Sequence, residues 1–213
     1  MLHPEERLLF RPNTSGPVSI CLAYPNTWAV GMANLGYQAV YRLLATTPGV
    51  VCERVFLAAD GSRPKTEESG RSPAEFDIVA FSLSFESDYP NIVRILDSAG
   101  IPARRTARRE SERGWPMLLA GGPATFPTAT SIVAPGSVFG DYFLVEASRG
   151  CEWGCRFCAA GFMYRPVRHR SAESLTAQAL EGLPNSAAAT VGLVGAEMAS
   201  HPGIASTCER IAG

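Results

Sequence analysis

Lysine is almost absent from this chain of 213 residues, since Lys65 is the only lysine among 19 basic side chains. Acidic and basic groups nearly cancel to a formal net charge of −1, so the whole molecule offers no electrostatic argument for binding nucleic acid or an anionic membrane. No apolar run approaches the roughly 20 residues that a bilayer-spanning helix needs, and the first residues carry charges where a signal peptide is apolar. We therefore expect a cytoplasmic protein that does not enter membranes.

Low-complexity tracts and internal repeats are absent too. Hydrophobic residues make up 46% and charged residues 18%, which excludes a mainly disordered chain and leaves enough apolar material for a core. The 20 glycines and 16 prolines follow no collagen-like period. A chain of this length is expected to form one large domain or two small ones.

Disulfide bonds are not expected, because a reducing cytoplasm keeps the six cysteines as thiols. The cysteines are unevenly distributed along the chain. Three of them stand alone, namely Cys21, Cys52 and Cys208, whereas the others form one tight group, namely Cys151, Cys155 and Cys158. We therefore expect this group to carry the chemistry of the protein.

The first half of the chain alternates short, almost continuously apolar runs with stretches of helical spacing. Such runs are typical of a parallel sheet that helices cover on both faces. The pattern predicts an α/β fold with a doubly wound, Rossmann-like parallel sheet. The expected strands are 18–24, 50–57, 76–83 and 117–120, and the expected helices are 34–45, with Asn34 as its N-cap, and 89–99.

Several segments between these elements have more than one interpretation. Residues 60–73 are polar and are expected to form an exposed loop. Residues 104–113 contain five arginines and form either a solvated connector or a patch for an anionic ligand. The turn at Gly121 and Gly122 either approaches a cofactor closely or is a tight strand-to-helix turn.

Glu86, Asp88 and Tyr89 follow the third strand, at the end where α/β sheets bind ligands. Asp88 has a second interpretation as a helix cap. The pattern of alternating elements weakens after Thr125 into a stretch rich in Pro, Thr, Ser and Ala, which predicts a domain boundary. The second half then predicts strand 142–148, helix 171–183 with Ser171 as its cap, strand 190–194 and helix 203–212.

The cysteine group has the spacing C-x3-C-x2-C, in a segment with two glycines that allow the thiols to turn toward one centre. Thiolates are soft ligands that select iron–sulfur clusters, zinc or copper(I). Three ligands suit a cluster with one open iron, whereas structural zinc is usually held by four protein ligands. His169 is the nearest candidate for a fourth ligand, but it lies far beyond Cys158.

This motif resembles the signature of the radical S-adenosylmethionine (SAM) enzymes, in which an aromatic residue precedes the last cysteine. The resemblance implies that Cys151, Cys155 and Cys158 hold three irons of a 4Fe–4S cluster and that SAM chelates the fourth. It also implies that Phe157 lies against the adenine. A one-electron transfer into the sulfonium would then give a 5′-deoxyadenosyl radical, which abstracts hydrogen from an unknown substrate.

The end of the strand at 190–194 resembles another element of these enzymes, a Gly-Gly-Glu sequence that contacts the amino group of SAM. Here Gly195 and Glu197 match that element, whereas Ala196 replaces the second glycine. The alternative is an ordinary strand end. The strand before the cysteines and the helix after them resemble the first β/α unit of a partial TIM-type barrel, with the cysteines where barrel enzymes place their chemistry.

Most of the chain resembles an uncharacterised radical SAM group that carries a cobalamin-binding-like domain first. The resemblance implies a cobalamin-binding-like α/β domain at 1–130 and the incomplete start of a radical SAM domain at 131–213, so we expect an N-terminal fragment or truncated product. The resembling segments are Tyr24-Pro25-Asn26-Thr27, Val30-Gly31-Met32, Glu53-Arg54-Val55-Phe56, Phe81-Ser82-Leu83-Ser84-Phe85-Glu86, Gly121-Gly122-Pro123 and Ala160-Gly161-Phe162-Met163-Tyr164-Arg165-Pro166.

Cobalamin is the cofactor for which this sequence departs from the pattern. Cobalt-ligating domains use an Asp-x-His-x-x-Gly motif, and none of His3, His169 and His201 lies in one. The first domain is therefore alternatively a substrate or docking module.

A radical SAM enzyme implies an electron donor such as a ferredoxin or flavodoxin, besides its substrate. Two other functions remain open: a non-catalytic zinc or iron–sulfur module, and a cobalamin- or nucleotide-binding module with a vestigial cysteine segment. Arginines make the cysteine region locally basic, which favours an anionic cluster–SAM complex or nucleic acid, or else reflects pairing with carboxylates elsewhere. These arginines are Arg149, Arg156, Arg165, Arg168 and Arg170.

Overall fold

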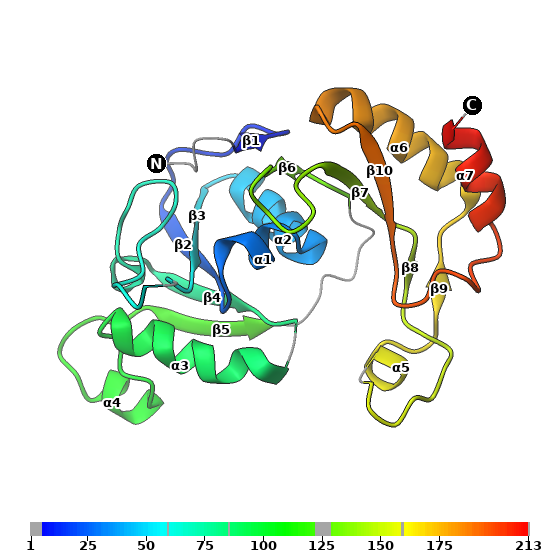
Figure 1. The fold of residues 1–213 in the computed structure, drawn as a ribbon. Helices are drawn as coiled ribbons and strands as arrows, with labels where there is room; N and C mark the ends of the chain where they lie inside the picture. The colour runs from blue at the N-terminus through cyan, green and yellow to red at the C-terminus, as the bar shows by residue number, and fades with distance from the viewer. Residues whose placement is uncertain (1–5, 59, 85, 122–128, 159, 213) are drawn as a thin grey trace.

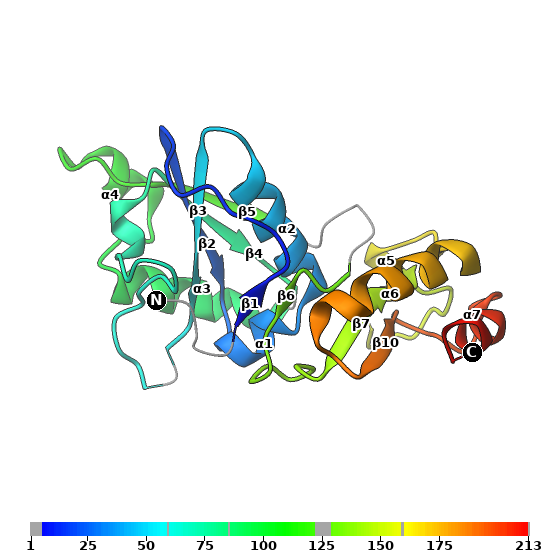
Figure 2. The same ribbon diagram turned by 90° about the horizontal axis from the view of Figure 1, so that it is seen from above.

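The computed structural model of the protein describes residues 6–58, 60–84, 86–121, 129–158 and 160–212. The elements form two bodies that lie side by side (Figures 1 and 2). We call residues 6–121 the sheet domain, residues 129–134 the strap, and residues 141–212 the cysteine-loop unit.

Four parallel strands form the sheet of the sheet domain, in the spatial order β3-β2-β4-β5. In the central strand β2, Ile20 and Leu22 enter the core on one face, and Cys21 and Ala23 enter the core on the other. Both faces are buried, which explains the nearly continuous apolar runs and confirms the predicted parallel α/β sheet. The strands are β2 (Val18–Tyr24), β3 (Val50–Phe56), β4 (Ile78–Ser82) and β5 (Met117–Gly121).

Helices α1 and α2 cover one face of this sheet and α3 covers the other (Figure 1). The prediction that Asn34 caps α2 is confirmed, because its side-chain oxygen accepts a hydrogen bond from the backbone N–H of Tyr37 at 2.9 Å. The ring of Tyr37 packs edge-on against Tyr24 and Phe56, with centroids 5.2 and 5.5 Å apart. The helices are α1 (Trp28–Met32), α2 (Leu35–Thr46), α3 (Tyr89–Ser98) and α4 (Arg105–Arg109), with 3-10 turns at Pro73–Glu75 and Glu86–Asp88.

The predicted exposed loop at 60–73 is wrong in part, because Thr66 is buried. The Glu53 carboxylate, on β3, accepts hydrogen bonds from the hydroxyls of Thr66 and Ser69 at 2.5 Å and from Arg71 at 2.7 Å. A charged strand residue thus ties the loop to the sheet, which composition alone does not reveal.

A buried ion cluster fastens the same loop and the N-terminal segment to β3. The Arg54 guanidinium is fully buried, pairs with the Glu6 carboxylate, and donates from Nε to Glu68 at 2.7 Å. It also lies 4.7 Å from the ring centroid of Tyr41. Burial disfavours the charge on Arg54, but the hydrogen bonds to Glu6 and the attraction of Glu68 outweigh burial and raise its pKa.

Two other expected segments differ in detail. The predicted strand 76–83 begins at Ile78, because a capping box at Ser72 and Glu75 closes a 3-10 turn immediately before it. The arginine-rich connector includes the short helix α4, which buries none of its residues. Arg108 holds this helix by donating to the carbonyls of Pro102 at 2.6 Å and Ala103 at 2.8 Å.

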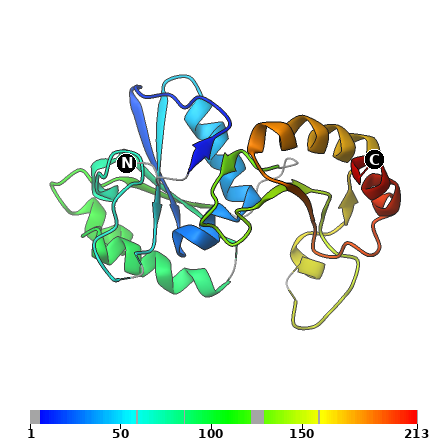
Figure 3. The ribbon, with the colours of Figure 1, turned by 45° about the horizontal axis from the view of Figure 1, so that its top comes forward.

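In the cysteine-loop unit, β7 and β10 pair in parallel and α6 packs against them (Figure 3). Ser171 caps α6 as predicted, and the helix extends to Ser186, past the expected end at Leu183. Two parallel strands with a helix between them form a β/α unit and do not by themselves establish a barrel. The elements are β7 (Tyr142–Glu146), β8 (Ser148–Arg149), β9 (Arg168–His169), β10 (Thr190–Val194), α5 (Ala160–Met163), α6 and α7 (Ala172–Ser186 and Ile204–Ala212).

The strap bonds to both bodies. The buried Gln38 side chain, on α2, accepts hydrogen bonds from the backbone N–H groups of Ser131 at 2.8 Å and Ile132 at 3.0 Å. On its other side, Thr130 exchanges two hydrogen bonds with the backbone of Leu144, on β7. In addition, β6 (Ile132–Val133) pairs antiparallel with β1 (Arg7–Leu8). Ile132 and Ala134 belong to the first core of the sheet domain. The domain boundary predicted between residues 130 and 131 stays a prediction.

Candidate metal centre

The cysteines lie in one loop that a two-stranded antiparallel ribbon closes. Ser148 pairs with His169 and Arg149 pairs with Arg168, so β8 and β9 bracket residues 150–167, which we call the cysteine loop. Because β8 follows β7 after a single residue, the loop begins at the carboxyl end of the parallel pair. This is the end of the strands that α/β enzymes use for chemistry.

Two glycines allow the cysteine loop to fold back on itself. Gly150 has φ of +89°, and a Cβ there would overlap the carbonyl oxygen of Tyr164. A Cβ on Gly161 would overlap the carbonyl oxygen of Trp153. Both contacts join the first part of the loop to its last part, so they bring the cysteine segment close to α5.

The three cysteines remain accessible in this loop. Cys151 is half-buried, Cys155 and Cys158 are exposed, and none forms a disulfide. The backbone N–H of Cys158 donates to the carbonyl of Cys155 at 3.1 Å, which makes the end of the motif a turn. Across the described ranges, no three Cys, His, Asp or Glu side chains are arranged to hold a metal ion, so the thiols do not converge on one point.

The donor set nevertheless suits an iron–sulfur cluster with one open iron. It consists of three soft thiols on one accessible loop, and the isolated cysteines differ from it in environment. Burial raises the pKa of Cys21 and of Cys52, so these thiols stay protonated in the sheet domain. Ligation by Cys151, Cys155 and Cys158 stays a prediction.

Aromatic side chains of the loop face solvent. Phe157, the residue expected to lie against adenine, is 94% exposed, and Trp153 is 57% exposed. Phe162 is also exposed, with the Arg165 guanidinium 5.8 Å from its ring centroid. These rings offer flat apolar surface beside the thiols, where a planar base can stack.

Two arginines near the loop are paired inside the cysteine-loop unit. Arg149 forms a two-pronged ion pair with Glu146, at 2.6 and 2.7 Å. Arg170 donates to Gln178, to the hydroxyl of Ser174 at 2.8 Å, and to the carbonyl of Glu146 at 3.2 Å. Their partners come from β7 and α6, so part of the local positive charge supports the fold of the unit itself.

Gly195 and Glu197 lie just beyond the end of β10. A Cβ on Gly195 would overlap the Ser148 hydroxyl, so glycine lets β10 pass close to the start of the cysteine loop. The exposed Glu197 carboxylate accepts hydrogen bonds from the Ser200 hydroxyl and from the backbone N–H groups of Ala199 at 2.7 Å and Ser200 at 3.0 Å. The pKa of Glu197 lies below its usual range, chiefly because the Ser200 hydroxyl donates to the carboxylate. The backbone N–H groups and the nearby His169 lower this pKa further. Contact of Gly195 and Glu197 with SAM stays a prediction.

A second candidate ligand site lies in the sheet domain, at the carboxyl ends of β2 and β4. The side-chain amide of Asn34 donates to the Ser84 hydroxyl at 2.9 Å and approaches the Tyr24 hydroxyl at 3.4 Å, so it spans both strands. Asp88 precedes α3 but makes no side-chain cap; its carboxylate instead accepts from Asn26 at 3.4 Å. Tyr89 is exposed. This edge is thus bridged by the domain's own side chains. The Glu86 side chain and Gly122, which the sequence also indicated, lie outside the part of the chain that the structure describes.

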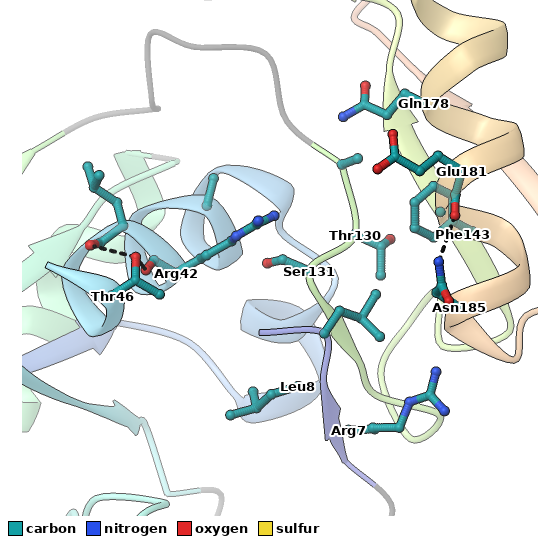
Figure 4. Close-up of a pocket in the computed structure, with 15 residues that line it drawn as sticks. Arg7, Leu8, Arg42, Thr46, Thr130, Ser131, Phe143, Gln178, Glu181 and Asn185 are labelled. Carbon is teal, nitrogen blue, oxygen red and sulfur yellow. Dashed lines mark hydrogen bonds between the residues drawn. The ribbon is translucent and has the colours of Figure 1, made fainter. Parts of the chain in front are cut away.

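A large cavity lies away from the cysteines, between α2, the strap and α6 (Figure 4). It has a volume of about 840 Å³. Arg7 and Arg42 line it from the sheet domain, and Gln178 and Glu181 line it from α6. Because α6 connects two parallel strands, its last turns lie at their amino ends, opposite the cysteine loop. The cavity is therefore separate from the candidate metal centre.

A pair of histidines is the feature that sequence reasoning missed. The rings of His169, on β9, and His201, beyond β10, have centroids 4.9 Å apart at an interplanar angle of 77°. His201 is only 3% exposed. No local motif links the two residues, because only the packing of β9 against the loop after β10 brings them together.

Comparison with known proteins identifies the family of this chain. A family model described as radical SAM proteins, N-terminal, matches residues 36–145, just over half of the chain. The chain belongs to this family. The radical SAM match runs from α2 through the sheet domain and the strap into β7, and it ends before the first cysteine of the motif. The family assignment and the cysteine motif therefore come from different residues.

An uncharacterised protein of Methanocaldococcus jannaschii is 29% identical over 119 residues. The matched stretch covers 55% of this radical SAM family chain and 26% of the relative. The chain thus spans about a quarter of the relative's length. No solved structure matches the chain significantly. Within the part of the chain that the structure describes, no helix is long and apolar enough to cross a membrane.

Proposed function

We propose that this protein is a radical SAM enzyme, or the N-terminal part of one, that binds a 4Fe–4S cluster through Cys151, Cys155 and Cys158. The observation that carries the proposal is the position of these thiols. They lie accessible in one loop at the carboxyl end of β7, in a chain whose preceding residues belong to a radical SAM family. A bound cluster would supply an electron for the reductive cleavage of SAM to a 5′-deoxyadenosyl radical, which would act on an unknown substrate.

The residues around the cysteines would position SAM. Phe157 and Trp153 offer exposed rings for the adenine, and Gly195 lets the loop after β10 approach the cysteine loop closely. The exposed Glu197 carboxylate is held by the backbone N–H groups of Ala199 and Ser200 and by the Ser200 hydroxyl, and its negative charge would attract the ammonium of SAM. An electron donor such as a ferredoxin or flavodoxin would serve the cluster.

The sheet domain would act as a substrate or docking module in this proposal. Its topology is compatible with a cobalamin-binding-like fold, but neither described histidine belongs to it, since His169 and His201 lie in the other body. We therefore propose no cobalt ligation by a described histidine of this domain.

Anaerobic reconstitution with iron and sulfide, followed by electron paramagnetic resonance of the reduced protein, tests the proposal. We expect a 4Fe–4S signal that SAM perturbs and that Cys155→Ala removes. Cys208→Ser is the matched control, because Cys208 is also exposed but lies on α7, and we expect it to retain the signal.

Two results would point to other functions. Stoichiometric zinc without a cluster would favour the non-catalytic metal module and overturn the proposal. A cluster whose signal SAM leaves unchanged would favour electron transfer. Release of 5′-deoxyadenosine would then test turnover by this chain directly.

A further inference from the structure

The hydrogen bonds around the His201 ring assign the proton of its neutral form to Nε2. The backbone N–H of Gly203 donates a hydrogen bond to His201 Nδ1 at 3.1 Å, so Nδ1 is an acceptor and carries no proton. In the neutral ring the proton must then be on Nε2, which is a hydrogen-bond donor. The chain itself thus selects one tautomer of a histidine that is almost completely buried.

This donor has no hydrogen-bond acceptor among the described residues, although it is buried. Buried donors in folded proteins are nearly always paired, because an unpaired one keeps the full cost of leaving water. The nearby ring of His169 offers at most a weak N–H···π contact. The tautomer is therefore held in a form that can donate to an oxygen that the described residues do not supply.

The surroundings of His201 relate it to the candidate metal centre. His169 pairs in register with Ser148, so it belongs to the ribbon that closes the cysteine loop. His201 follows the turn that Glu197 organises, and its N–H donates to the carbonyl of Met198 at 3.2 Å. Both ends of the cysteine loop and the loop after β10 thus meet at the two histidines.

We propose that His201 is a SAM-contacting residue, whose Nε2–H donates a hydrogen bond to an oxygen of SAM bound beside the cysteine loop, with the His169 ring as an adjacent wall. SAM offers suitable acceptors in its carboxylate and ribose oxygens. This inference rests on the proposed function and adds a binding residue to the same site.

Two variants distinguish the roles of the two ring nitrogens of His201. His201→Asn retains an oxygen that can accept from Gly203 but removes the donor at the Nε2 position, whereas His201→Gln can place an amide N–H near that position. In reconstituted protein, the SAM concentration at the midpoint of the paramagnetic-resonance change measures SAM binding without turnover. We expect His201→Asn to raise this midpoint about tenfold and His201→Gln to raise it much less.

The control is Cys208→Ser, because Cys208 is exposed on α7 and has no part in the proposed site, and it should leave the midpoint within about twofold of the wild type. Iron content and circular dichroism establish that each variant is folded and loaded. A wild-type midpoint in His201→Asn, or equal weakening in the Asn and Gln variants, would overturn the role of Nε2–H and leave the proposed function intact. Absence of a SAM effect in the wild type would instead overturn the proposed function, and this inference with it.

A measurement on the unsubstituted, cluster-free protein provides an independent check. Long-range proton–nitrogen correlation spectra of the histidine rings distinguish the two neutral tautomers. We expect His201 to carry its proton on Nε2. An Nδ1-protonated His201 would contradict the inference even if a variant failed to fold.

Discussion

The sheet domain and the cysteine-loop unit differ in how they treat their buried polar groups. In the sheet domain, buried charges have partners from the same body: Arg54 lies between Glu6 and Glu68, and Glu53 accepts from three side chains. In the cysteine-loop unit, the buried Nε2–H of His201 has no described acceptor, and the rings around the thiols face solvent. The sheet domain therefore pairs its buried charges internally, although the neutral indole N–H of Trp115 lacks an acceptor among the described residues, whereas the cysteine-loop unit presents groups that suit a ligand.

The same contrast holds for the carboxyl ends of the parallel strands. At the carboxyl ends of β2 and β4, where α/β sheets bind ligands, the Asn34 amide bonds to Tyr24 at the end of β2 and to Ser84 just beyond β4. At the end of β7 and β10, the chain instead forms a long accessible loop with three thiols. One topological position thus serves internal bonding in one body and is left accessible in the other.

The largest effect is expected from breaking the buried ion cluster of the sheet domain. Arg54→Met leaves the buried Glu6 carboxylate without its partner, so we expect a loss of about 3–5 kcal/mol in the free energy of unfolding, measured with urea. Arg94→Met is the control, because Arg94 is exposed and its guanidinium donates to the nearby Asn91, and it should cost less than about 0.5 kcal/mol. Equal stability of the two variants would mean that the cluster does not hold the domain together.

The joint between the bodies is the next most sensitive position. Gln38→Leu removes the acceptor of the Ser131 and Ile132 N–H groups, so we expect a loss of about 3 kcal/mol and faster hydrogen exchange at both amides. Hydrogen exchange followed by mass spectrometry resolves the strap from the sheet. Unchanged exchange in residues 129–134 would contradict the role of Gln38 as the joint.

The pKa of Glu53 indicates how acid changes the stability of the sheet domain. Burial disfavours its charge, but hydrogen bonds from Ser69, Thr66 and Arg71 outweigh burial and hold the pKa of Glu53 below its ordinary value of 4.5. Because the folded-state pKa is lowered, the ionised group stabilises the fold above about pH 4.5, and this contribution is lost as the pH falls through the folded-state pKa. Unfolding free energies from pH 7 to pH 3 should therefore fall more steeply for the wild type than for Glu53→Gln. Parallel curves would rule out this linkage.

The smallest effect is expected at the exposed aromatic of the cysteine loop. Phe157→Ala should change the free energy of unfolding by less than about 0.5 kcal/mol, because the ring is 94% exposed and has little packing to lose. Thermal unfolding checks this, with the buried Phe81→Ala as the contrasting variant. A large loss at Phe157 would show that the loop packs against the protein, and the contrast between the two bodies would weaken.

Local patterns in the sequence predicted most elements of the fold. Apolar runs identified the strands to within a few residues, and the cap residues Asn34 and Ser171 identified two helix starts, because caps act within one turn. The extension of α6 through Pro184 was missed, since tertiary packing overrides a residue that usually ends helices. The burial of Thr66 was missed because its partner, Glu53, lies on a strand that precedes the loop.

The sequence by itself determined the parallel α/β architecture of the sheet and the spacing of the three cysteines, because periodicity and short-range spacing are properties of neighbouring residues. Only the tertiary structure decided that Arg54 lies between two glutamates, that Gln38 bonds to the strap, and that His169 meets His201. Each of these contacts joins residues far apart in the chain. They form only when packing of the apolar faces brings distant segments together, which no local pattern encodes.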